Sequence, residues 1–294
     1  MANRARPNSP APTAGPAVQV PAPKGSGRAG RDLRAAIGVG MALAGLILVS
    51  VYTVRVIWIG VLCLAVAMGT YELARAVKTA DLQVPVIPLV VAGAALPAIA
   101  YARGVAALVA AALIAVFAAM CWQVLEPVQP TLRDLSASAL CIVYVGFLAG
   151  FAALLSTPGD GPRRITIFVS VTVASDIGGF AAGVLSGGRH KMAPTISPGK
   201  SWEGFAGSAL TCMVTGAIMV PLMLTGGTVL EGVALGAALV GSATLGDLGE
   251  SMLKRDIGIK DMSDLLPGHG GIMDRLDSLL PSAPVAWLLL TAFT

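Results

Sequence analysis

The feature that most constrains this chain is a succession of apolar runs, each about as long as a membrane-crossing helix. Nine runs are present, at residues 35–54, 56–74, 84–101, 105–122, 135–155, 165–185, 205–224, 229–248 and 272–293. A transmembrane helix needs about 20 predominantly apolar residues. Charged residues make up 12% of the 294 positions, whereas an ordinary soluble domain has about 25%. The sequence therefore predicts an all-α, polytopic membrane helical bundle with about nine transmembrane helices. A soluble enzyme and a nucleic-acid-binding module are excluded as readings of the whole chain.

The chain divides into three parts by composition. Residues 1–34 hold six prolines among Ala, Gly and Ser, and six Lys/Arg against a single acid. This composition predicts a disordered basic tail, and the apolar sequence that follows favours contact with anionic lipid over nucleic acid. Residues 35–164 supply the N-terminal helices. Residues 165–294 supply a second set of helices together with the polar loops, and we expect them to be the catalytic region.

Positive charge predicts how the chain is oriented in the membrane. Nine helices with a cytoplasmic N-terminus place 16 of the 20 Lys/Arg on the cytoplasmic side and four outside. Such an excess is typical of cytoplasmic segments. We therefore expect a multi-pass protein of the cell (plasma or inner) membrane, with its N-terminus in the cytoplasm. Both long polar loops, at about 186–204 and 249–271, fall on that same side.

One carboxylate, Asp176, lies near the middle of the sixth apolar run. A charged side chain at the centre of a transmembrane helix costs about 2.5–3.5 kcal/mol on insertion scales, so such residues are usually functional. The alternative is an Asp that pairs with a basic or hydroxyl neighbour for packing alone. Gly178 and Gly179 follow it, and they would let another helix or a ligand approach closely.

A second polar segment, residues 189–204, combines cations, hydroxyls and turn-forming residues. Ser201 is placed to cap a helix that begins at Trp202. Lys200 would then lie at a helix N-terminus, where a cation is unfavourable unless an anion binds beside it. A phosphate is the natural candidate, and an ordinary basic cytoplasmic loop is the alternative.

The third segment, residues 246–277, is the richest in charge. On a helix, Asp247, Glu250 and Lys254 share one face, while Asp274 and Asp277 share another. Carboxylates gathered at a membrane boundary without Cys or His partners suit Mg²⁺, which takes its other ligands from water and substrate phosphates.

Three further residues of that segment also suit phosphate chemistry. Arg255 adds positive charge, and Gly270 and Gly271 leave room for backbone N–H groups to approach a phosphate. The neighbouring His269 would act as a general base, donate a hydrogen bond to a phosphate, or cap a nearby loop. Together these features predict a nucleotide or pyrophosphate site that is reached from the cytoplasm.

Residues 251–277, hereafter the signature segment, resemble the signature of the phosphatidate cytidylyltransferase (CDP-diacylglycerol synthase) family. Its fixed positions are filled by Ser251, Lys254, Arg255, Lys260, Asp261, Pro267, His269, Gly270, Gly271, Asp274, Arg275 and Asp277. Residues 197–204 and 176–180 resemble two further family segments, although Gly179 and Phe180 stand where Ala and Tyr are usual. The resemblance covers about residues 165–293.

The resemblance implies transfer of CMP from CTP to phosphatidate, a step of phospholipid biosynthesis that releases pyrophosphate. It implies Mg²⁺ dependence, allows an additional monovalent cation such as K⁺, and implies a homodimer. Asp247 and Asp274 would ligate the metal, and Lys254 and Asp277 would complete the catalytic group. The implied substrate-binding residues are Asp176, Ser197, Lys200, Ser201, Arg255, His269, Gly270, Gly271 and Arg275.

Two other functions stay open at this stage. A relative that acts on a different lipid phosphate fits the same pattern, because acyl-chain contacts are nonspecific apolar surface. A secondary transporter would account for Asp176 and the proline-broken last run, but the polar residues gather at one membrane face and no internal repeat is present.

Overall fold

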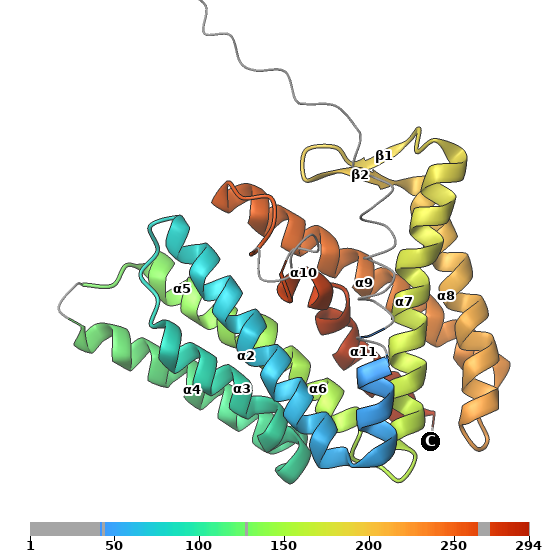
Figure 1. Ribbon diagram of the computed structural model, residues 1–294, viewed down its shortest axis with the longest axis horizontal. Coiled ribbons are helices and arrows are strands. Elements are labelled where there is room, and N and C mark those ends of the chain that lie inside the picture. The colour runs from blue at the N-terminus through green and yellow to red at the C-terminus, as the bar shows by residue number, and fades with distance from the viewer. Residues whose placement is uncertain (1–41, 43–44, 127–128, 264–270, 294) are drawn as a thin grey trace, which may run out of the picture.

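The computed structural model describes residues 42, 45–126, 129–263 and 271–293. Residues 45–53 are helical, and the rest of the described chain is a helical bundle with one small hairpin (Figure 1). The elements in order are α2 (Arg55–Thr79), α3 (Val86–Arg103), α4 (Val105–Leu125), α5 (Leu132–Leu140), η1 (Cys141–Phe147), α6 (Leu148–Leu155), α7 (Gly161–Ser186), β1 (Lys191–Ala193), β2 (Ser197–Ser201), α8 (Trp202–Met223), α9 (Val229–Ile257), α10 (Met273–Leu276) and α11 (Leu279–Ala292).

Within the described residues, seven helical stretches are long and apolar enough to cross a membrane. They coincide with seven of the nine predicted spans, from the second to the eighth. The predicted all-α, polytopic membrane fold is thereby confirmed. The first predicted span, 35–54, falls partly outside the described residues, as does the whole of the 1–34 tail.

The ninth predicted span, 272–293, is two helices rather than one. The four residues of α10 are followed by a turn at Asp277 and then by the 14-residue α11. At 1.5 Å per residue α11 is about 21 Å long, less than the roughly 30 Å hydrocarbon core. Pro281 explains the break, because a proline ring clashes with the carbonyl four residues earlier, which is that of Asp277.

The polar loop predicted at 186–204 contains a two-stranded antiparallel hairpin. Lys191 pairs with Ser201, and Ala193 pairs with Ser197. Helix α8 begins directly after β2, and the Ser201 hydroxyl accepts a hydrogen bond from the Gly204 N–H at 3.2 Å. The predicted helix cap is confirmed, and it fixes how the hairpin joins the membrane helices.

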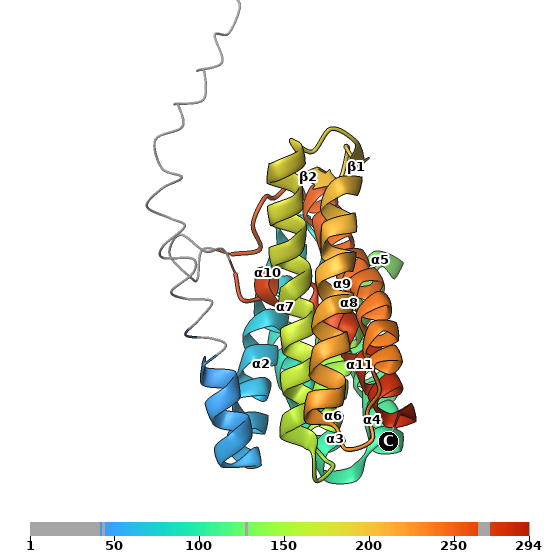
Figure 2. The same ribbon diagram turned by 90° about the vertical axis from the view of Figure 1, so that its right-hand side faces the viewer.

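Helices α7, α8 and α9 form the half of the bundle that carries the hairpin (Figures 1 and 2). Close approach of α7 and α8 depends on glycine: a side chain at Gly178 would collide with the Thr211 hydroxyl and with the Gly207 carbonyl, which lies 2.7 Å from the Cβ position. The predicted role of this glycine in helix approach is confirmed. Figure 1 places the hairpin and the C-terminal ends of α2 and α9 at the same end of the bundle.

Helix α9 is longer than a bilayer requires. Its 29 residues span about 44 Å, some 14 Å more than the hydrocarbon core. Thr228 and Glu231 form a capping box at its start, and Gly258, in the left-handed conformation at φ 81°, ends it. With the first two thirds of α9 in the hydrocarbon core, the polar residues of its last third would extend to the level of the lipid headgroups.

Candidate active site

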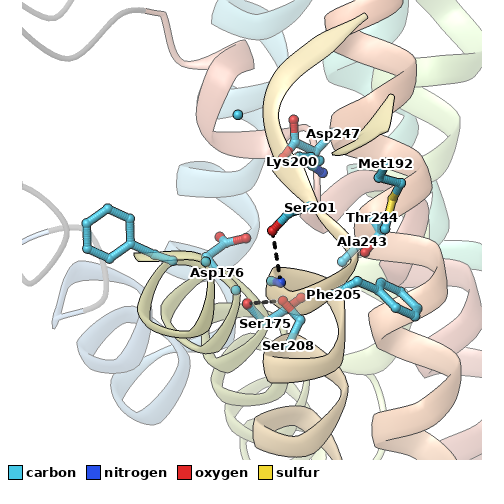
Figure 3. Close-up of a pocket in the computed structure, with 15 residues that line it drawn as sticks. Ser175, Asp176, Met192, Lys200, Ser201, Phe205, Ser208, Ala243, Thr244 and Asp247 are labelled. Atoms are coloured by element: carbon cyan, nitrogen blue, oxygen red, sulfur yellow. Dashed lines mark hydrogen bonds and ion pairs between the residues drawn. The ribbon is translucent and has the colours of Figure 1, made fainter. Parts of the chain in front are cut away.

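A cavity of about 330 Å³ lies among α7, α8, α9 and β2, at the hairpin end of the bundle (Figure 3). Four residues predicted from sequence line it, namely Asp176, Lys200, Ser201 and Asp247. They come from three different elements, so the fold brings together groups that are up to 71 positions apart in the chain.

The strongest interaction in this cavity is an ion pair. The Lys200 ammonium lies 2.7 Å from Oδ2 of Asp247, and both side chains are partly shielded from solvent. Lys200 sits just before the N-terminus of α8, where we expected an anion to offset its charge. The structure supplies a carboxylate of the protein for that purpose, so a bound phosphate is not needed to explain the lysine.

Serine side chains complete the floor of the cavity (Figure 3). The Ser208 hydroxyl donates to the Ser175 carbonyl at 2.6 Å, joining α8 to α7. Ser201 is buried and engaged in the cap of α8. Asp176 points into the same space, with no hydrogen bond or ion pair to the other lining residues. Sequence reasoning missed Ser175 and Ser208, because single hydroxyls in apolar helices carry no distinctive pattern.

A second charged cluster lies further along α9. The Lys254 ammonium lies 2.7 Å from Oδ1 of Asp274 and 3.2 Å from Oε2 of Glu250. Oδ2 of Asp274 also accepts the backbone N–H groups of Met262, at 3.2 Å, and Gly271, at 2.8 Å. Lys254 therefore connects α9 to α10 and is itself surrounded by carboxylates.

The predicted metal ligands can be tested against this geometry. Asp274 already accepts three hydrogen bonds, which leaves it one free acceptor direction. Oε1 of Glu250 is buried and accepts no hydrogen bond from a donor among the described residues, and the Asp277 carboxyl is its side-chain neighbour. Two acids in contact call for a shared proton or a cation. The described residues contain no group of three or more His, Cys, Asp or Glu side chains placed to hold a metal. The donor chemistry fits Mg²⁺, which often uses only one or two carboxylates.

Two elements meet α9 at Gly246, immediately before Asp247. The Asp277 carbonyl and the Pro281 ring occupy the space that a side chain there would need. From the other side, the Tyr144 hydroxyl donates to the Gly246 carbonyl at 3.4 Å. Tyr144 belongs to η1, a π-helical stretch of the kind that often occurs at functional sites. The backbone of Asp277 is thus adjacent to the charged part of α9.

The other predicted residues are less central. Arg255 donates to the Ile196 carbonyl of the hairpin at 3.4 Å, and Ser197 pairs with Ala193 at the start of β2. Arg275 lies in α10. His269 and Gly270 lie outside the described residues.

One acid of this region was missed from the sequence. Glu72, on α2, is 1% exposed, and its carboxylate accepts hydrogen bonds from the signature segment. A weaker signal was available, because Glu72 is a carboxylate inside the second apolar run, although it lies near the end of that run and not at its middle.

The fold and the two charged clusters define a multi-pass membrane protein with a polar site at one end of its helices. The chain belongs to the cytidylyltransferase family, whose model matches residues 34–293. A phosphatidate cytidylyltransferase of Mycobacterium bovis is 43% identical over 94% of this chain and 93% of its own length. That of Mycobacterium leprae is 41% identical over 91% and 90%. That of Haemophilus influenzae is 42% identical over 41% of this chain and 43% of its own.

Proposed function

We propose that this protein transfers CMP from CTP to phosphatidate, giving CDP-diacylglycerol and pyrophosphate. The observation that carries the proposal is the similarity to phosphatidate cytidylyltransferases, which extends over nearly the whole chain. The family match includes every element that contributes to the two charged clusters. The position of those clusters, at one end of the membrane helices, supports a substrate pair in which one member is a lipid and the other is soluble.

The reaction needs charge neutralisation more than proton transfer. A phosphate oxygen of phosphatidate bonds to the α-phosphorus of CTP, and the bond from that phosphorus to the oxygen bridging to the β-phosphate breaks, so pyrophosphate leaves. A phosphomonoester is already largely ionised at pH 7, so the nucleophile needs no strong base. The protein must hold several negative groups together in line, which calls for positioning and fixed positive charge.

The cations of both clusters are suited to that role. Lys200 and Lys254, with Arg255 and Arg275, would hold the phosphates of CTP and phosphatidate. Asp247 and Asp274 would hold Mg²⁺, which supplies further positive charge to the phosphates when bound; a monovalent cation such as K⁺ belongs to the same proposal. The buried contact between the Glu250 and Asp277 carboxyls makes a nearby positive charge favourable in this part of the site.

We place the site at the cytoplasmic face of the cell membrane. CTP is a cytosolic nucleotide, whereas the acyl chains of phosphatidate stay in the bilayer. The distribution of Lys and Arg favours the same side. The homodimer implied by the resemblance is a separate proposal, and the mass of the protein in its detergent complex checks it.

Pyrophosphate release tests the proposal directly. Purified protein is incubated in detergent–phosphatidate micelles with CTP and Mg²⁺, against controls that lack each component. We expect release only when all three are present. Release with a polyprenyl or ether-lipid phosphate, but not with phosphatidate, would keep the nucleotidyl transfer and change the lipid. An absence of release with every lipid phosphate, from folded protein, would refute the proposed function.

A further inference from the structure

Glu72 connects the two halves of the chain through its carboxylate. The residue lies on α2 in the N-terminal half and is almost completely buried. Its Oε1 accepts the Ser263 hydroxyl at 2.6 Å and the Ile272 N–H at 3.0 Å, and its Oε2 accepts the Met273 N–H at 2.8 Å. These donors are about 190–200 positions away in sequence, and all three belong to the signature segment.

Asp274 accepts hydrogen bonds from the neighbouring residues of that segment. Its carboxylate takes the N–H groups of Met262 and Gly271, which directly precede two of the donors to Glu72. Two acids therefore satisfy four backbone N–H groups and one hydroxyl between them. The shared arrangement brings residues 262–263 beside residues 271–273 and fixes the orientation in which Asp274 meets Lys254.

Gly271 reflects how closely Glu72 approaches the segment. A Cβ atom added at Gly271 would lie 2.5 Å from Oε2 of Glu72, closer than real Cβ contacts permit. The sequence analysis assigned this glycine to close approach of a phosphate. In the structure, the group that occupies the space beside it is the Glu72 carboxylate.

We propose that Glu72 is a positioning residue for the reaction, because its carboxylate holds the part of the signature segment that carries Asp274 and Arg275. The inference rests on the proposed function. Glu72 itself contacts the backbone and Ser263 rather than a phosphate-binding cation. Its removal should therefore lower kcat through misplacement of other groups, without loss of a direct contact to CTP.

Asp134 provides a matched control. Its buried carboxylate likewise accepts two backbone N–H groups, from Gln83 at 2.6 Å and Thr131 at 2.8 Å, and one hydroxyl, that of Thr131 at 2.7 Å. Its donors lie in the N-terminal half and outside the signature segment. Glu72→Gln and Asp134→Asn thus remove equivalent acceptors, but only the first alters the proposed positioning.

The experiment compares both variants with the wild-type protein in the pyrophosphate assay. We expect Glu72→Gln to lower kcat by about 10- to 100-fold, as a displacement of roughly 1 Å can do, with KM for CTP changed by less than about threefold. Asp134→Asn should keep kcat within about threefold of wild type, even if its thermal stability falls as far as that of Glu72→Gln. Equal losses of kcat in the two variants, or a wild-type kcat in Glu72→Gln, would overturn the inference.

Two additions keep the test decisive. Should Glu72→Gln not fold, Ser263→Ala removes only one of the three donors and is expected to lower kcat severalfold in stable protein; an unchanged kcat there would count against positioning. Hydrogen exchange of residues 271–276 gives a readout that does not need activity, and it should be faster in Glu72→Gln but not in Asp134→Asn. If the wild-type protein is inactive, the proposed function fails. If hydrogen exchange of residues 271–276 is unchanged in Glu72→Gln, the positioning inference is overturned, whatever the activity.

Discussion

Lys254→Met gives the sharpest test of the charged cluster on α9. In the structure the Lys254 ammonium bonds Glu250, which is fully buried, and Asp274, whose side chain is 13% exposed. Removal of the lysine leaves the buried Glu250 carboxyl with no positive partner, and its remaining side-chain neighbour is another acid, Asp277. Loss of one member of a buried ion pair typically costs about 3–5 kcal/mol. We expect a decrease of that size in the free energy of unfolding.

A double variant separates the ion pair from the rest of the side chain. Glu250→Gln removes the charge that Lys254 neutralises, while Asp274 keeps its two backbone donors. Lys254→Met with Glu250→Gln should therefore recover most of the lost stability, as measured by denaturant titration in detergent micelles. A loss below about 1 kcal/mol in Lys254→Met alone would refute this reasoning, because that is the range of exposed pairs.

The same double variant decides what Lys254 does in the reaction. If it is folded and does not release pyrophosphate, the lysine is needed by the substrate phosphates, as the resemblance implied. If it is folded and fully active, Lys254 serves the fold alone, and the phosphate contacts belong to other cations.

Three further predictions concern single residues. Asp274→Asn should abolish pyrophosphate release while the protein stays folded, and normal turnover with Mg²⁺ would contradict its assignment as a metal ligand. Arg164→Ala should lower the free energy of unfolding by about 1–3 kcal/mol, because it leaves the Leu290 carbonyl, now 3.0 Å from the guanidinium, without that donor. Its KM for CTP should be unchanged, and a large increase would contradict the predicted orientation in the membrane. Ser201→Ala should cost about 1 kcal/mol through loss of the α8 cap, and thermal unfolding that matches wild type would show that the bond to the Gly204 N–H contributes nothing.

The sequence was sufficient for features that depend on local composition. Apolar runs of bilayer length predicted seven helices that the structure contains. The Ser201 cap was predictable because a serine directly before an apolar run has few other uses. The i, i+4 pair of Glu250 and Lys254 followed from helical spacing alone.

Features that depend on tertiary contact could not be predicted in the same way. Lys200 and Asp247 are 47 positions apart, and no spacing rule pairs them. The β1–β2 hairpin was missed because its strands are only three and five residues long, and β2 contains Pro198 and Gly199. Glu72 could have been noticed as a carboxylate inside the second apolar run, although it lies near the end of that run. Its partners could not be predicted, because almost every residue has a backbone N–H group and the sequence does not show which of them lie beside Glu72.

The excess length of α9 links the site to the thickness of the membrane. A span that exceeds the hydrocarbon core is accommodated by tilt or by local thickening of the bilayer. In a thicker bilayer less of the last third of α9 would stand clear of the acyl chains, and Asp247 would move toward the hydrocarbon boundary. On the proposed function, the lipids made from the product set that thickness. The depth at which the protein meets its nucleotide would then vary with the chain length of the lipids it helps to make.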